Sequence, residues 1–136
     1  MNKKGFTLIE LMASIALLGV LVTIAVVSFS KYLDKTRDTI YKDYEESLKG
    51  ATTNYLLDHT GLLPAINDTN GSKIIANTLI NEGYLESIKD PKNKSLYCND
   101  NSYVIVTRKN DVDFNMNLEY YICLVCSKYK SSSCRW

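Results

Sequence analysis

Residues 11–30 read LMASIALLGVLVTIAVVSFS and contain no charged residue. Twenty helical residues span roughly 30 Å, which is the thickness of the hydrocarbon core of a bilayer. The rest of the chain is mostly polar and rich in Asn, Lys, Asp and Tyr. A soluble domain does not concentrate its apolar residues in this way. The stretch therefore predicts a membrane-spanning helix.

The charges before this stretch predict its orientation. Lys3 and Lys4 precede it, and positive residues stay on the cytoplasmic side of a membrane. Residues 31–136 are then expected outside. A secretory signal peptide that is removed whole is one alternative, but the apolar run is longer than usual and lacks a convincing small-x-small cleavage site. An uncleaved single-pass anchor is the other alternative.

The bulk composition excludes several classes of function. A chain of 136 residues allows one domain, and its net charge of +1 gives no general preference for nucleic acid or another polyanion. No glycine-rich phosphate loop is present, and the single histidine, His59, lies at the expected end of a helix. The sequence therefore predicts neither an enzyme nor a bound cofactor.

The residues around the start of the apolar run form a specific motif. Residues 3–12 read KKGFTLIELM, which is a basic leader, a glycine, an apolar residue and then Thr-Leu-Ile-Glu. This motif resembles the N-terminal signal of type IV prepilins and pseudopilins. The resemblance implies that a membrane prepilin peptidase cleaves between Gly5 and Phe6 and that the new amine of Phe6 is methylated. A glycine at the cut lets the protease approach the backbone closely.

Glu10 is a carboxylate within the apolar segment and needs a physical reason. Such a group costs on the order of 2.5–3.5 kcal/mol on insertion scales and usually has a partner. In filaments of the pilin family, the matching glutamate is thought to face the N-terminal amine of a neighbouring subunit. The resemblance therefore implies that Phe6 and Glu10 set the register between subunits. A Glu10 that stays hydrated at the membrane interface is the alternative.

One departure from the family concerns the second half of this segment. Many members carry a proline there, where the helix can unwind in the filament. Residues 19–28 contain no proline here, and Gly19 is the only intrinsic weak point. The departure puts in doubt whether this helix melts and stretches.

Beyond the apolar run, the sequence predicts an outer helical half with one apolar face. The members of that face recur every three or four residues: Ile40, Tyr44, Leu48, Ala51 and Tyr55. The whole helix is expected to run from Phe6 to about His59, and Gly61 is a plausible stop.

The remaining residues predict a small sheet. Ser72 is expected to cap a short helix with Ile75, Leu79 and Ile80 inward, ending at Gly83. The segment from Tyr84-Leu85 to Asp90-Pro91 resembles the connection between helix and sheet in many pilins. Composition predicts strands over Ser102–Arg108 and Leu118–Cys126, a turn at Asn110-Asp111 and a short edge strand at Tyr97–Cys98.

Together these elements predict an α+β fold in which a long N-terminal helix packs on a small antiparallel sheet stapled by disulfides. The expected organisation is a leader peptide (1–5), a transmembrane or filament-core segment (6–30) and a head (31–136).

The cysteines predict two disulfides, because all four lie beyond the membrane: Cys98, Cys123, Cys126 and Cys134. If Cys123 and Cys126 lie in one strand, their side chains point to opposite faces and are too far apart to bond, which disfavours the pair 123–126. The pairing 98–123 with 126–134 is favoured, and 98–126 with 123–134 remains open. A four-cysteine zinc site is a rival hypothesis, but only one close pair of cysteines exists.

The function implied by the resemblance is that of a structural subunit, single-pass in the cytoplasmic membrane and then part of a cell-surface filament. Its implied partners are other pilin subunits, prepilin peptidase, an inner-membrane assembly platform and an ATPase. The subunit would be a major or minor pilin, or else a pseudopilin of a secretion or competence machine.

A hypothesis of another class is a binding module for DNA or a surface glycan carried on the filament. The basic and aromatic tail, with Lys128, Lys130 and Arg135, has a suitable composition. A solvated loop tied by disulfides is the simpler interpretation of this tail.

Overall fold

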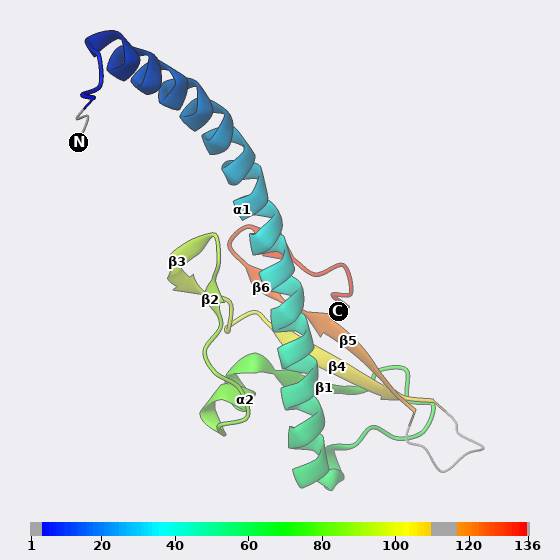
Figure 1. Ribbon diagram of the computed structural model, residues 1–136. Helices are drawn as coiled ribbons and strands as arrows, with labels where there is room; N and C mark the ends of the chain where they lie inside the picture. The colour runs from blue at the N-terminus through cyan, green and yellow to red at the C-terminus, as the bar shows by residue number, and fades with distance from the viewer. Residues whose placement is uncertain (1–3, 110–116, 136) are drawn as a thin grey trace. The chain divides into compact units, whose positions relative to one another are not determined.

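The computed structural model describes residues 4–109 and 117–135. Its first element is α1 (Leu8–Asp58), an unbroken helix of 51 residues that begins and ends within two residues of its predicted bounds. The chain divides into two compact units between Thr36 and Arg37, so α1 contributes to both (Figure 1). Within the described chain, α1 is the one helix that is long and apolar enough to cross a membrane.

The second unit contains a three-stranded antiparallel sheet in the order β1-β4-β5. The strands are β1 (Ser72–Ile75), β4 (Tyr103–Arg108) and β5 (Leu118–Cys123). Two hairpins flank this sheet: β2 (Lys89–Asp90) with β3 (Asn93–Tyr97), and β6 (Val125–Cys126) with β7 (Tyr129–Lys130). A single turn, η1 (Thr60–Leu62), and a short helix, α2 (Ala76–Asn81), complete the unit.

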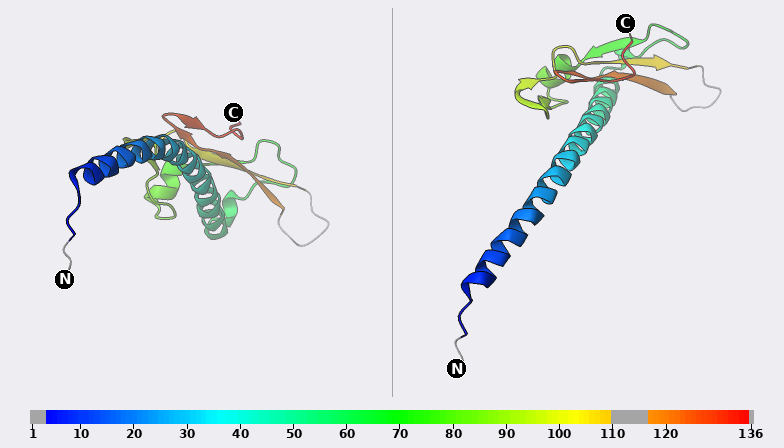
Figure 2. Two further views of the ribbon diagram at one scale, coloured as in Figure 1. Left: turned by 45° about the horizontal axis from the view of Figure 1, so that its top comes forward. Right: turned by 90° about the horizontal axis from the view of Figure 1, so that it is seen from above.

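The outer part of α1 forms one layer and the sheet forms the other (Figures 1 and 2). Side chains of α1, among them Leu48 and Leu56, are fully buried in one cluster with Val104 and Val106 of β4. Thr53 of α1 also donates a hydrogen bond of 2.9 Å to the hydroxyl of Tyr120 on β5. The predicted α+β fold is therefore confirmed.

The prediction of a helix cap at Ser72 is wrong. Ser72 begins β1 and pairs with Val106, because four extended residues here find a partner strand in β4. Its hydroxyl donates to the carbonyl of Leu62 at 2.7 Å. The helix itself starts four residues later, with no side-chain cap. The predicted end is close to the observed one: α2 stops at Asn81, and Gly83, two residues later, has the positive φ of 82° that is common just past a helix.

Two strand predictions need revision, and one turn lies outside the described residues. The β4 prediction is confirmed, but the predicted strand 118–126 breaks at Leu124, whose amide donates to the Ser131 hydroxyl. The edge strand predicted at 97–98 is β3, which covers residues 93–97 and pairs with β2. The turn predicted at Asn110-Asp111 falls in the segment that the structure does not describe.

Both disulfides form, but the favoured pairing is wrong. The bonds join Cys98 to Cys126 and Cys123 to Cys134. The reason is the break after β5, which places Cys126 in a separate hairpin. The Ser102 hydroxyl accepts from the amide of Val125 at 3.0 Å and donates to the carbonyl of Cys98, so it holds Cys98 beside β6. No thiolate remains for the rival zinc site, since none of the four cysteines is free.

A buried carboxylate joins α1 to both hairpins. Asp90 is 1% exposed and accepts hydrogen bonds from the Tyr41 hydroxyl (2.6 Å), the Lys92 amide (2.9 Å), and the amide and hydroxyl of Ser127. Burial raises the pKa of Asp90, but the hydrogen bonds from Ser127, Tyr41 and Lys92 outweigh it, and the resulting pKa is about 2. The carboxylate is thus charged and fully engaged at neutral pH.

We predict that Asp90→Asn destabilises the head by about 1–3 kcal/mol, because an amide group would face donors of Ser127 or Tyr41. Since the folded pKa of Asp90 lies below its ordinary value of 3.8, its contribution is present above about pH 4 and is lost as the pH falls toward 2. Urea unfolding at pH 7 and pH 3 checks both statements. The exposed Asp43→Asn is the matched control, and equal stability of the two variants at pH 7 would contradict the prediction.

Candidate functional site

The first unit presents its apolar side chains without any internal cover. Every described residue from Lys4 to Thr36 is exposed, and large side chains such as Leu17, Leu21 and Ile24 are more than 60% exposed. Burial of apolar surface is the main source of folding energy, so an isolated surface of this size is unfavourable in water. The segment therefore requires a lipid or protein environment.

Most hydroxyls of the apolar run find a partner within the helix. Three of them donate to carbonyls of the preceding turn: Ser14 to Glu10, Thr23 to Val20 and Ser30 to Val26, at 2.7–3.0 Å. The helix also continues through Gly19 without interruption. In a bilayer every polar group must find an internal partner. The helical backbone of the apolar run and the hydroxyls of Ser14, Thr23 and Ser30 meet that requirement.

A reciprocal cap closes the N-terminus of α1. The Glu10 carboxylate accepts hydrogen bonds from the amide and the hydroxyl of Thr7, both at 3.0 Å, and the Glu10 amide donates to the Thr7 hydroxyl at 3.4 Å. This is the capping box, in which a Thr and a Glu three residues later satisfy each other's free donors. The Thr-x-x-Glu spacing of residues 7–10 is the sequence signal of this cap.

The predicted cleavage position lies just before this cap. Residues 4–7 are not helical, Phe6 is 87% exposed and no atom lies within 4 Å of a Cβ built on Gly5. The bond between Gly5 and Phe6 is thus accessible to a protease. A cut there would leave the three hydrogen bonds between Thr7 and Glu10 intact. The predicted partner of Glu10 on another chain is outside what a single chain can contain.

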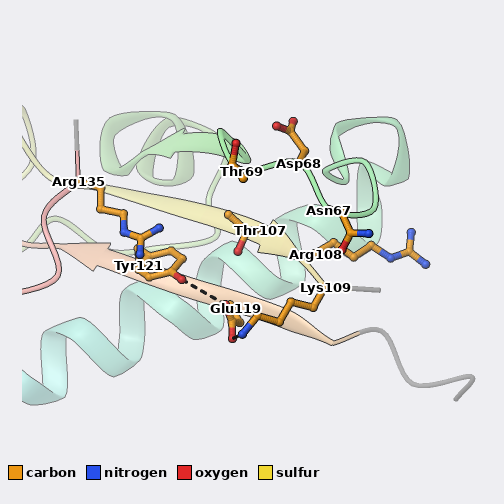
Figure 3. Close-up of a pocket in the computed structure, with 9 residues that line it drawn as sticks. All are labelled: Asn67, Asp68, Thr69, Thr107, Arg108, Lys109, Glu119, Tyr121 and Arg135. Atoms are coloured by element: carbon orange, nitrogen blue, oxygen red, sulfur yellow. Dashed lines mark hydrogen bonds and ion pairs between the residues drawn. The ribbon is translucent and has the colours of Figure 1, made fainter. Parts of the chain in front are cut away.

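One polar recess of the head is lined in part by Arg135 of the predicted basic tail. This pocket of about 310 Å³ lies between the loop at 67–69, the ends of β4 and β5, and Arg135 (Figure 3). The Arg135 guanidinium stacks on the Tyr121 ring at 3.7 Å. Glu119 accepts hydrogen bonds from Lys109 and from Tyr121. The charged groups that line this pocket therefore largely compensate one another.

The structure separates Arg135 from the two lysines of the predicted basic tail. Arg135 lies over the outer face of β5, whereas Lys128 lies in the β6–β7 turn and Lys130 lies on β7. The three cations do not converge on a single pocket, since the recess is lined by Arg135 alone among them. Among the described residues, no group of three or more His, Cys, Asp or Glu side chains could hold a metal ion.

Comparison with known proteins addresses the N-terminal segment first. The family described as prokaryotic N-terminal methylation motif matches residues 1–26. The chain is 33% identical over 87 residues to the type IV major pilin protein PilE of Neisseria gonorrhoeae, which covers 64% of this chain and 50% of the relative. It is 37% identical over 86 residues to the fimbrial protein EcpC of Eikenella corrodens, covering 63% and 53%.

Residues 1–26 carry the prokaryotic N-terminal methylation motif, and the chain is similar to type IV pilins. It spans about half the length of the pilins that it matches. This pilin-like chain is also 25% identical over 107 residues to the competence protein ComGC of Bacillus subtilis, which covers 79% of this chain and 92% of that relative. No solved structure matches it significantly.

We predict that Thr7→Val frays the first turn of the pilin helix, because valine keeps the shape of threonine and loses the hydroxyl. Loss of an N-cap costs about 1 kcal/mol, which corresponds to roughly fivefold faster exchange of the Glu10 amide. Hydrogen exchange followed by NMR of the chain in nanodiscs measures this rate. Thr7→Ser keeps the hydroxyl and is the control. Identical Glu10 exchange in the two variants would show that the cap contributes nothing.

Proposed function

We propose that this chain is a structural subunit of a type IV pilus or a pilus-like filament. The observation that carries the proposal is a capped, fully exposed apolar helix that directly follows a prepilin motif. Such a helix has two environments that cover it. Lipid surrounds it while the subunit is anchored in the membrane, and the helices of other subunits surround it in the filament.

The membrane-anchored stage precedes assembly. Residues 6–30 cross the cytoplasmic membrane once, the leader 1–5 stays on the cytoplasmic side, and residues 31–136 form the outer head. Prepilin peptidase cleaves after Gly5, and Phe6 is methylated. An inner-membrane platform and an ATPase then move the subunit into the filament. These assignments rest on the match of residues 1–26 and on the accessible position of the Gly5–Phe6 bond.

Phe6 and Glu10 are the residues that direct assembly in this proposal. Before cleavage, the Glu10 carboxylate has its own Thr7 as partner, which reduces the cost of a charge near the membrane. Cleavage creates a positive amine at Phe6. In the filament this amine faces the Glu10 carboxylate of a neighbouring subunit and fixes the axial register between the helices.

The comparisons favour a second variant of the same function. The similarity to ComGC, a competence protein, spans nearly the full length of that relative, whereas the similarity to the pilins spans half of theirs. A pseudopilin of a DNA-uptake machine is therefore the second candidate. The third hypothesis, a filament-borne module that binds DNA or a glycan through the tail, loses support because Arg135 lies apart from the β6–β7 turn that carries Lys128.

We predict that Glu10→Val is cleaved and inserted into the membrane but is absent from filaments sheared from the native cell, because the register-setting charge is gone. Immunoblots of the membrane and sheared fractions measure this distribution. Glu46→Val places the same change on the exposed outer part of α1 and is expected to assemble normally. Recovery of Glu10→Val in the sheared fraction at the level of Glu46→Val would overturn the proposed role of Glu10.

A further inference from the structure

The two hairpins of the head concentrate lysines with almost no exposed acid. Residues 89–97 and 125–130 contain five lysines: Lys89, Lys92, Lys94, Lys128 and Lys130. Their single acidic residue is Asp90, which is buried and already accepts four hydrogen bonds. We call the exposed faces of these two segments the basic hairpin surface. Lysines therefore outnumber acidic residues by five to one in these two segments.

The two hairpins are linked to each other. The Cys98–Cys126 disulfide and the hydrogen bonds from Ser127 to Asp90 join them covalently and non-covalently. Both lie beside the same stretch of α1, whereas α2 and β1 lie beside its later turns (Figure 1). The nearest acidic side chains of that stretch are engaged. Asp38 pairs with Lys92 at 3.0 Å, and Glu45 accepts from Tyr129 at 2.8 Å.

Apolar side chains accompany these lysines. All five residues of β3 are exposed, and Leu96 and Tyr97 expose 47% and 54% of their surface next to Lys94. A strand with lysine, leucine and tyrosine on its exposed faces has the composition of a segment that lies at a membrane interface, where aromatic and basic residues meet headgroups. A site built only for phosphate recognition would not need the exposed leucine.

Only a short stretch of chain separates the basic hairpin surface from the apolar run. Asp38, which pairs with Lys92, follows the last residue of the uncharged run by only eight residues. Eight helical residues rise by about 12 Å, and surface charges act over a Debye length of about 8 Å. A tether this short gives the lysines a high effective concentration at the membrane. Each lysine near an anionic bilayer then favours the docked state about fivefold.

We propose that the basic hairpin surface binds the phosphate headgroups of anionic lipids while the subunit is anchored in the membrane. This inference rests on the membrane-anchored stage of the proposed function. Lys94 and Lys128 form no ion pair with the described residues and supply the charge, and Leu96 and Tyr97 enter the headgroup layer. The contact is lost when the helix leaves the bilayer, so it holds the head against the membrane until extraction.

The test uses the full chain in nanodiscs of phosphatidylcholine alone or with one quarter phosphatidylglycerol. Hydrogen exchange by mass spectrometry follows residues 93–97 and 127–130. We expect exchange at least fivefold slower in the anionic discs, with the difference abolished by 0.5 M NaCl. The variant Lys94→Glu/Lys128→Glu is expected to lose this protection. The variant Lys49→Glu/Lys73→Glu changes the charge by the same amount on exposed positions outside the hairpins and is expected to keep it.

The outcomes separate this inference from the proposed function. If the chain inserts into both discs but residues 93–97 exchange at the same rate, lipid binding is wrong and the filament proposal is unaffected. If the chain fails to insert into either disc, the membrane stage itself is wrong. If anionic lipid has no effect but a labelled DNA duplex protects the same residues, the surface binds nucleic acid and the lipid proposal is overturned. Equal protection in both double variants also contradicts it.

Discussion

An apolar helix that its own chain does not cover is the constraint on which the rest of the molecule depends. The described residues of the first unit are exposed without exception, and water is a poor solvent for such a surface. In the proposed function, the segment moves from one apolar environment to another, from lipid to the packed helices of other subunits. Hydrogen bonds from its hydroxyls to its own carbonyls and its reciprocal cap suit both, because neither environment supplies water to unsatisfied polar groups.

The head has the opposite difficulty, since it has too small a core to depend on apolar burial alone. Two disulfides and one buried carboxylate compensate. Asp90 draws a tyrosine of α1, the turn after β2 and the turn between β6 and β7 into one network. Tyr41 and Tyr129 stack at 4.2 Å beside it. The cysteine bridges close loops of 28 and 11 residues of separation, and the longer loop is expected to contribute more.

The elements that depend on local sequence could be predicted, and those that depend on distant partners could not. The bounds of α1 follow from the uncharged run and the spacing of apolar residues. The apolar stripe was placed slightly off, since Tyr41 and Leu56 are buried while Ile40 is only half-buried. Residues 72–75 form a strand because β4 lies beside them, and no local signal reports that neighbour. The disulfide pairing depends on the strand break at Leu124, and no local sequence signal indicates that break either.

The candidate site divides in the same way. The roles of Gly5, Phe6 and Glu10 rest on a contiguous motif and stay predictions, whereas the Thr7–Glu10 cap has a signal in its spacing. The importance of Asp90 and the continuity of the lysine-bearing hairpins required the fold, because their contacts join residues about 40 to 85 positions apart in the chain. Cations that are neighbours in the tail sequence were divided between two surfaces for the same reason.

The central claim is that this chain is cut between Gly5 and Phe6 and retained as a filament subunit. Mass spectrometry of filaments sheared from the native cell tests it most directly, by reading the N-terminal peptide of the chain. We predict a peptide that begins at a methylated Phe6. A chain that still begins at Met1 in cells with active prepilin peptidase, and that stays out of the sheared fraction, would contradict the account.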